Sequence, residues 1–418
     1  MPLQVMQLTL GSSRLTTRFW TNVATSLRLN EKNRLSEFDV LPMHPQPRQD
    51  ELLSSWLVRL AFSNRFPLHT FCSGVLGFKG PIWNRDIDRH QPDHLLTLLC
   101  QETGQPIQAL MDMTLARYES TFFQELSSQG VIAWLLPLGI FHRTHRLAGL
   151  QYCPLCLKED PLPYYRLRWR IALAVVCRHH GCVMEGLCPQ CKAPIIFHRH
   201  GVGREKAPHV SQLRLCHACG ADLGLATPRY PNWSDESTVR HLTALTSNFE
   251  ACPWSGLVEG VPCAVPFFGG MHQILCLLNG RYGQRLQRTF CPALGVDVLP
   301  PSRTYFERQD VDRRLELVLR ACWLLQEWPE RFVHCCRAMG MSRSRVSELP
   351  GALPYWLDMV LLNYLDLRTY IVSEREVSEA ADYLIAHGRE VTLDALMPLL
   401  GQQRDATRRL FKQWVSLQ

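Results

Sequence analysis

The strongest constraint on the fold is a run of paired metal-ligand residues between Cys153 and Cys219. Those 67 residues hold eight of the chain's 17 cysteines, and most of these stand three positions from another potential ligand. The four pairs are, in chain order, Cys153/Cys156, Cys177/His180, Cys188/Cys191 and Cys216/Cys219. Two ligands spaced in this way on a tight turn reach one tetrahedral zinc ion without strain. Four pairs complete two sites, so the sequence predicts two zinc ions (Zn2+) per chain.

The order of the pairs leaves two arrangements open. Sequential pairing joins the first pair to the second and the third to the fourth, as in tandem zinc-ribbon-like modules. Cross-braced pairing, as in a RING domain, is the poorer fit because seven residues separate His180 from Cys188. Cys182 stands outside the pair spacing and is interpreted as a non-ligand next to His179. Disulfides are disfavoured, since no signal peptide precedes the segment and a cytosolic chain keeps its thiols reduced.

The composition is that of a folded protein without a membrane span. Of 418 residues, 46% are hydrophobic and 20% charged. The longest apolar run, residues 131–141, contains Pro137 and Gly139, and a spanning helix needs roughly 20 apolar residues. Residues 151–225 contain ten Lys/Arg and five Asp/Glu, which is +5 of the net charge of +7. This charge favours a polyanionic partner near the zinc sites, although solvated basic loops would explain it too.

An alternating row of arginines lies between the first two ligand pairs. Arg166, Arg168 and Arg170 alternate with Leu167 and Trp169. If the segment is a strand, its period of two puts the three arginines on one face. Such a row is suited to phosphate groups, and its aromatic neighbours to stacking. We therefore predict nucleic-acid contacts for the three arginines, on the condition that the segment is extended.

Helical patterns lie on the N-terminal side of the zinc region. From Leu52, apolar residues recur three and four positions apart, which predicts a helix that Asp50 caps and that ends near Asn64. Pro67 begins a second helix, which Gly77 ends. A helix, a short turn and a helix are compatible with a helix-turn-helix, and equally with any small helical domain.

Two more helix-turn-helix candidates lie on the C-terminal side, at residues 331–349 and 393–414. The second helix of the latter carries Arg404, Arg408 and Arg409, for which we also predict nucleic-acid contacts. Ordinary helical packing would produce the same patterns.

The predicted fold is mainly α, with a central pair of small zinc-binding modules and helix-turn-helix elements on both sides. The expected domains are a poorly ordered N-terminal arm (1–40), a helical N-terminal domain (41–130), a tandem zinc-finger region (150–228) and a helical C-terminal domain (229–418). The arm is rich in Arg and Ser, with Glu31 as its first acidic residue. A transit segment, a disordered arm and an upstream start codon all remain open for it.

Two stretches carry a resemblance to a known family. After a proline-rich lead-in, residues 52–61 read Leu52-Leu-Ser-Ser-Trp-Leu-Val-Arg-Leu-Ala61, which resembles the start of TniQ proteins. The zinc region also resembles theirs, with Tyr152-Cys-Pro-Leu-Cys-Leu157, Trp169, Cys177-Arg-His-His-Gly181 and Cys188-Pro-Gln-Cys191. The resemblance covers roughly 41 to 225. The family's usual C-P-x-H-G becomes Cys177-Arg-His-His-Gly181, which keeps the ligand spacing and loses the proline.

The resemblance implies a target-selection protein of bacterial transposons, related to TnsD and not itself a transposase. The partners it implies are target DNA or an RNA-guided nucleoprotein complex, an AAA+ ATPase and a transposase, with a homodimer left open. It also implies a bacterial cytoplasmic location, close to the nucleoid or a plasmid.

Other classes fit the residues less well. A zinc-dependent transcription regulator shares the same motifs and would be distinguished by an effector pocket. The sequence has neither a P-loop G-x-x-x-x-G-K-[ST] nor H-E-x-x-H, and zinc sites filled by four protein ligands leave no position for a substrate. We therefore predict that the chain is not an enzyme, with a carboxylate-triad nuclease as the remaining enzymatic alternative.

Overall fold

The computed structural model of the chain describes residues 40–82, 86–90, 92–127, 130–138, 149–200, 208–250, 258–347, 352–366 and 372–400, with residues 408, 411, 412 and 415. These residues form two compact units, divided between Tyr364 and Leu365. Within the described ranges the units are built of helices, and strand-like pairing is limited to isolated bridges. The predicted mainly helical fold class is therefore confirmed.

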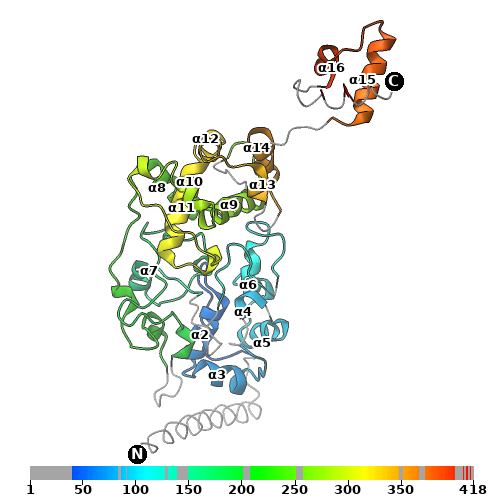
Figure 1. The fold of residues 1–418 in the computed structure, drawn as a ribbon. Coiled ribbons are helices and arrows are strands. Elements are labelled where there is room, and N and C mark those ends of the chain that lie inside the picture. The colour runs from blue at the N-terminus through cyan, green and yellow to red at the C-terminus, as the bar shows by residue number, and fades with distance from the viewer. Residues whose placement is uncertain are drawn as a thin grey trace, which may run out of the picture. The chain divides into compact units, whose positions relative to one another are not determined.

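Figure 1 shows the helices of the first unit, which are joined by short turns in some places and by long irregular segments in others, above all on either side of α7. They are α2 (Leu53–Ser63), α3 (Leu68–Thr70), α4 (Ile87–His90), α5 (Asp93–Thr103), α6 (Ile107–Met111), α7 (Pro154–Glu159), α8 (Glu236–Asn248), α9 (Ala264–Asn279), α10 (Gly283–Gln287), α11 (Val311–Leu325), α12 (Glu330–Ala338), α13 (Arg343–Ser347) and α14 (Tyr355–Leu365). Shorter turns of helix are η1 (Phe71–Val75), η2 (Leu115–Tyr118), η3 (Leu167–Arg170), η4 (Phe197–Arg199), η5 (Val210–Arg214), η6 (Leu223–Leu225), η7 (Pro292–Leu294) and η8 (Phe306–Arg308).

Helix α2 is the buried centre of the N-terminal half. It contacts α3 and α4 on one side and η4 and η5 of the cysteine-rich region on the other (Figure 1). Its apolar residues are buried as the spacing predicts, and so is Arg59, whose Nη2 lies 2.7 Å from Glu51 Oε2. A buried charge needs such a partner. The Arg59–Glu51 ion pair therefore allows α2 to be enclosed on all sides.

The predicted cap of this helix is wrong. Leu52 is the N-cap residue, without a side-chain hydrogen bond, and Asp50 lies two residues earlier with φ of 57°. Asp50 is turned inward, and burial raises the pKa of its carboxyl to about 6. The predicted end near Asn64 and the start after Pro67 are confirmed.

The C-terminal half of the first unit is a layer of longer helices around α11, which contacts α8, α9 and α12. Asp310 caps α11, since its side chain accepts a hydrogen bond from the Arg313 N–H. Helices α12 and α13 occupy the segment predicted as a helix-turn-helix. Its use as a DNA-binding motif stays a prediction.

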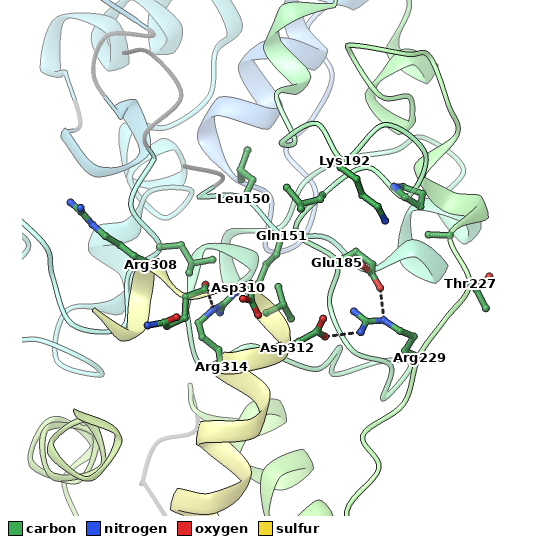
Figure 2. Close-up of a pocket in the computed structure, with 17 residues that line it drawn as sticks. Leu150, Gln151, Glu185, Lys192, Thr227, Arg229, Arg308, Asp310, Asp312 and Arg314 are labelled. Atoms are coloured by element: carbon green, nitrogen blue, oxygen red, sulfur yellow. Dashed lines mark hydrogen bonds and ion pairs between the residues drawn. The ribbon is translucent and has the colours of Figure 1, made fainter. Parts of the chain in front are cut away.

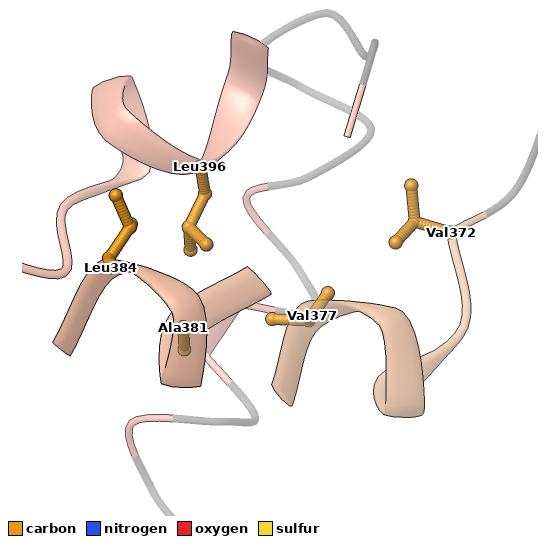
Figure 3. Close-up of a cluster of buried hydrophobic side chains, with 5 residues drawn as sticks. All are labelled: Val372, Val377, Ala381, Leu384 and Leu396. Carbon is orange, nitrogen blue, oxygen red and sulfur yellow. The ribbon is translucent and has the colours of Figure 1, made fainter. Parts of the chain in front are cut away.

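The second unit is a small helical hairpin of α15 (Glu374–Ala386) and α16 (Leu393–Leu400). Ser373 and Glu376 form a capping box at the start of α15. Val372, Val377, Ala381, Leu384 and Leu396 form its buried core (Figure 3). Most of the helix expected at 403–414 lies outside the described residues.

The structure does not test two of the predictions about domain organisation. The predicted boundaries at residues 130, 150 and 228 stay predictions, and nearly all of the N-terminal arm lies outside the described residues. Among the helices described, none has the length and apolar character that crossing a bilayer requires.

Candidate metal sites

Three of the four ligand pairs adopt the same tight turn. In each turn, a backbone N–H donates to the carbonyl of the first cysteine of the pair, which lies four positions earlier. The hydrogen bonds run from Gly181 to Cys177 (2.8 Å), from Lys192 to Cys188 (3.0 Å) and from Gly220 to Cys216 (2.9 Å). The backbone N–H of that same cysteine donates to the carbonyl of the residue five positions later, which is Cys182, Ala193 or Ala221. The donor residue has positive φ in all three turns. This turn holds the two side chains of a pair on one side of the backbone.

The remaining pair is held by a helix. Cys153 is the N-cap residue of α7, and its Sγ accepts a hydrogen bond from the Cys156 N–H at 3.4 Å. Pro154 is the first residue of the helix, where its missing N–H costs nothing. Both thiols are therefore placed by the first turn of α7.

The first cluster brings together the first and second pairs. Cys153, Cys156, Cys177 and His180 offer ligand atoms that all lie within 4.8 Å of one another. His180 Nδ1 lies 3.5, 3.4 and 3.5 Å from the Sγ atoms of Cys153, Cys156 and Cys177. Cys156 Sγ lies 3.6 Å from Cys177 Sγ. His180 Nε2 lies 2.9 Å from Glu159 Oε2, a contact that orients the ring so that Nδ1 faces the sulfur atoms.

These distances fit a tetrahedral metal ion. With zinc–sulfur bonds of about 2.3 Å and zinc–nitrogen bonds of about 2.0–2.1 Å, tetrahedral ligands lie about 3.8 Å apart for two sulfurs and about 3.6 Å for sulfur and nitrogen. The thiols are all free, and their Sγ atoms are much farther apart than the roughly 2.05 Å of a disulfide. The first cluster can therefore hold one metal ion with four protein ligands.

The second cluster brings together the third and fourth pairs, Cys188, Cys191, Cys216 and Cys219. Cys188 Sγ lies 3.7 Å from Cys219 Sγ, and Cys191 Sγ lies 3.6 Å from Cys216 Sγ. Cys191 and Cys219 are exposed, unlike any cysteine of the first cluster. Both clusters have the sequential arrangement.

The two clusters are packed together through η6. This turn follows the second cluster and contacts α7 of the first. A Cβ added to Gly224 would lie 3.2 Å from the backbone N and Cα of Lys158. A side chain at position 224 would therefore require a small shift of the two modules away from each other.

The structure contradicts the predicted phosphate-binding row of Arg166, Arg168 and Arg170. Residues 167–170 form the 3-10 turn η3, not a strand, and the three arginines are 7%, 3% and 1% exposed. Their guanidinium groups bind inside the protein: Arg166 to Asp160, Arg168 to the Thr246 carbonyl, and Arg170 to Asp86 and Asp88. Burial lowers the pKa of Arg170, but the two carboxylates more than offset this and raise it. These side chains hold segments of the core together and are not available to phosphate.

The C-terminal arginines are only partly described. Arg408 is exposed, while Arg404 and Arg409 lie outside the described residues. Their contact with nucleic acid stays a prediction.

Cys182 occupies a defined position in the first of the three turns, the one that begins at Cys177. Its carbonyl closes that turn, where Ala193 and Ala221 close the other two. Its own Sγ is buried and lies 3.5 Å from Cys153 Sγ, but it is not part of the four-ligand group. Cys182, Ala193 and Ala221 each lie five positions after the first cysteine of their pair. This spacing can be read from the sequence, and it makes Cys182 the equivalent of the two alanines.

The fold and the two clusters define a class: a helical protein with a pair of small modules, each of which can hold a metal ion. The TniQ family model matches residues 42–184, about a third of the chain, so these residues form a TniQ domain. The match contains α2 and all four residues of the first cluster and ends before the second. A search of curated proteins finds no match to this chain.

Proposed function

We propose that this chain is a non-catalytic transposition protein that selects target sites by binding DNA or a nucleoprotein complex. It then recruits an AAA+ ATPase and the transposase, in the bacterial cytoplasm. The TniQ match over residues 42–184 carries the proposal, since this family is associated with transposition. The clusters support a structural role for their metal, which we propose to be zinc, because four protein ligands leave no open position for catalysis.

An exposed group of arginines on the first unit is suited to duplex DNA. Arg281, Arg285 and Arg288 are exposed and are four and three positions apart around α10, a spacing that puts them on one side of a helical turn. The Arg281 guanidinium lies 4.5 Å from the Tyr282 ring centroid, and that of Arg345, from α13, lies 5.7 Å from the same ring. Arg281 and Arg345 thus place two positive charges at one aromatic ring, and Arg285 and Arg288 add two exposed charges at α10.

The α10 surface gives a direct binding test. Arg285→Ala/Arg288→Ala should weaken DNA binding and lower the slope of log affinity against log salt by about 0.9 for each phosphate that the protein no longer neutralises. The matched control is Arg375→Ala, which removes an exposed charge that is already paired with Glu379 at 2.8 Å. Equal slopes for the double variant and wild type would remove α10 from the DNA interface.

Transposition itself tests the function. Insertions should be mapped in cells that carry the transposition machinery with and without this chain. Loss or redistribution of insertions on deletion is the expected result; the same frequency and sites would reject target selection.

The absence of catalysis has its own test. Purified protein incubated with plasmid and Mg²⁺ or Mn²⁺ should leave the plasmid intact. Cleavage that co-purifies with the chain and is lost with a carboxylate substitution would move the chain to the nuclease class.

One observation favours the regulator alternative. A cavity of about 740 Å³ lies where α11 meets the cysteine-rich region (Figure 2). Arg229 lies at its wall between Glu185 and Asp312, at 3.0 and 2.6 Å, and the buried Arg314 reaches the Ala172 carbonyl. A transcription regulator would use such a cavity for an effector that changes its affinity for DNA. Site-directed insertion that depends on the chain would favour target selection instead.

A further inference from the structure

A thiol, an imidazole and a carboxylate lie in line on the C-terminal half of the first unit, away from both clusters in the sequence. Cys276 and His272 are one helical turn apart on α9, and Glu307 belongs to η8. His272 Nδ1 lies 3.6 Å from Cys276 Sγ, and His272 Nε2 lies 2.7 Å from Glu307 Oε1. This is the order of groups that activates a sulfur nucleophile: a base beside the thiol and an orienting group behind the base.

The histidine is held firmly in this geometry. Glu307 is buried, and its Oε1 also accepts the Trp134 backbone N–H at 2.9 Å. The rings of Trp134 and Phe306 pack edge-on to the His272 ring, with centroids 5.4 and 6.4 Å away. Burial lowers the pKa of His272, but its hydrogen bonds to Cys276 and Glu307 raise it to about 10. At neutral pH the ring therefore carries two protons, and its Nδ1–H points to the sulfur.

The thiol is also within reach of small molecules. Gly269, His272 and Cys276 form the partly exposed stripe of α9, at spacings of three and four, while the residues between them are buried. Cys322 on α11, by comparison, is fully buried, and burial raises the pKa of its thiol to about 12. Cys276 thus combines partial exposure with a cationic partner, the environment typical of reactive cysteines.

We propose that Cys276 is a reactive thiol, activated by His272 and Glu307, that exchanges with low-molecular-weight disulfides. Cys276 passes its proton to His272 and attacks one sulfur of the disulfide as a thiolate, so that a new S–S bond forms and the old S–S bond breaks. The second sulfur leaves as a thiolate and takes a proton from His272. Cys276 is oxidised to a mixed disulfide and the incoming disulfide is reduced. Exchange requires only a reachable sulfur and this proton donor, whereas acyl transfer would also need donors for an oxyanion.

Cys263 is an internal control for Cys276. It is the N-cap residue of α9 and is exposed, and among the hydrogen bonds of the described residues it has no histidine partner. Full-length, metal-loaded protein is treated with limiting iodoacetamide at pH 7, and alkylation of each cysteine is followed by peptide mass spectrometry. Cys276 should react about tenfold faster than Cys263, since an unassisted thiol is only a few per cent ionised at this pH. With oxidised glutathione, Cys276 should be the first of the two to form a mixed disulfide.

The partners are tested by substitution. His272→Gln should slow Cys276 to about the rate of Cys263 and make its rate rise with pH between 6.5 and 8.5 as that of Cys263 does. In the wild type the rate at Cys276 should change little over this range. Glu307→Gln should give an intermediate effect, and Glu307→Asp should restore part of the rate.

The wild-type comparison needs no variant, so the proposal can fail even if a substituted chain does not fold. A Cys276 rate equal to or below that of Cys263, or one that His272→Gln leaves unchanged in folded protein, would overturn it. Metal content and circular dichroism report the folding of each variant.

Discussion

The two metal clusters have the same ligand spacing but differ in how far the fold encloses them. All three cysteines of the first cluster are buried, and its helix α7 lies inside the TniQ domain. In the second cluster two of four cysteines are exposed, and all four lie beyond the TniQ match. Ligand spacing therefore predicts a metal site, but the surroundings of the site decide how much of the protein depends on the metal.

This comparison predicts unequal costs of ligand loss. Cys156→Ser should remove the first metal and unfold the TniQ domain, because structural zinc contributes roughly 10 kcal/mol or more in small metal domains and this ion is surrounded by the core. Cys219→Ser should remove the second metal and leave the TniQ domain folded. Zinc content by elemental analysis, with limited proteolysis of each variant, separates the two results.

The wild type sets the reference for this test. Protein purified without added metal should contain two zinc ions per chain, and each variant one at most. A wild-type value near one, or equal proteolysis of the two variants, would contradict the difference between the clusters.

Chelation should show the same order over time. Exposed Cys191 and Cys219 give a chelator direct access to the second metal, whereas the first is covered by protein. Zinc release to a colorimetric chelator should therefore have two phases of equal amplitude, the fast one belonging to the second cluster. In Cys219→Ser only the slow phase should remain. A single phase in the wild type would mean that the clusters open together, through the contact of η6 with α7.

How much of this the sequence could predict depends on how local each feature is. Ligand pairs are local, so their spacing identified all eight residues and favoured the sequential order that the structure has. The arginine row failed because alternation in the sequence has meaning only in an extended chain, and residues 167–170 are helical. The carboxylates that bind Arg170 are 84 and 82 residues away, so no local pattern could reveal its burial.

The group of Cys276, His272 and Glu307 could be predicted from the sequence only in part. The spacing of four between His272 and Cys276 is readable in any helix. The carboxylate comes from η8, 35 residues after His272, and only the packing of η8 against α9 brings it into place.

A smaller effect is expected at Cys182, the thiol next to the first cluster. Cys182→Ala should keep both zinc ions, because the residue is not a ligand and alanine already occupies the equivalent position of two other turns. Loss of its buried Sγ should lower the free energy of unfolding by about 1 kcal/mol. Zinc content and thermal unfolding check this; release of one metal ion would show that the ligand assignment is wrong.

The smallest difference concerns the turn residue that follows each ligand pair. Gly181 and Gly220 take the positive φ of their turns at no steric cost, but Lys192 takes a φ of 56° with a side chain. A left-handed conformation costs a residue with a Cβ roughly 1–2 kcal/mol. Lys192→Gly should therefore stabilise the second cluster by about 1 kcal/mol and slow the fast phase of zinc release. Lys192→Ala is the matched control, because it removes the same charge and keeps the strain. If both variants release zinc at the same rate, charge and not backbone strain sets the stability of this turn.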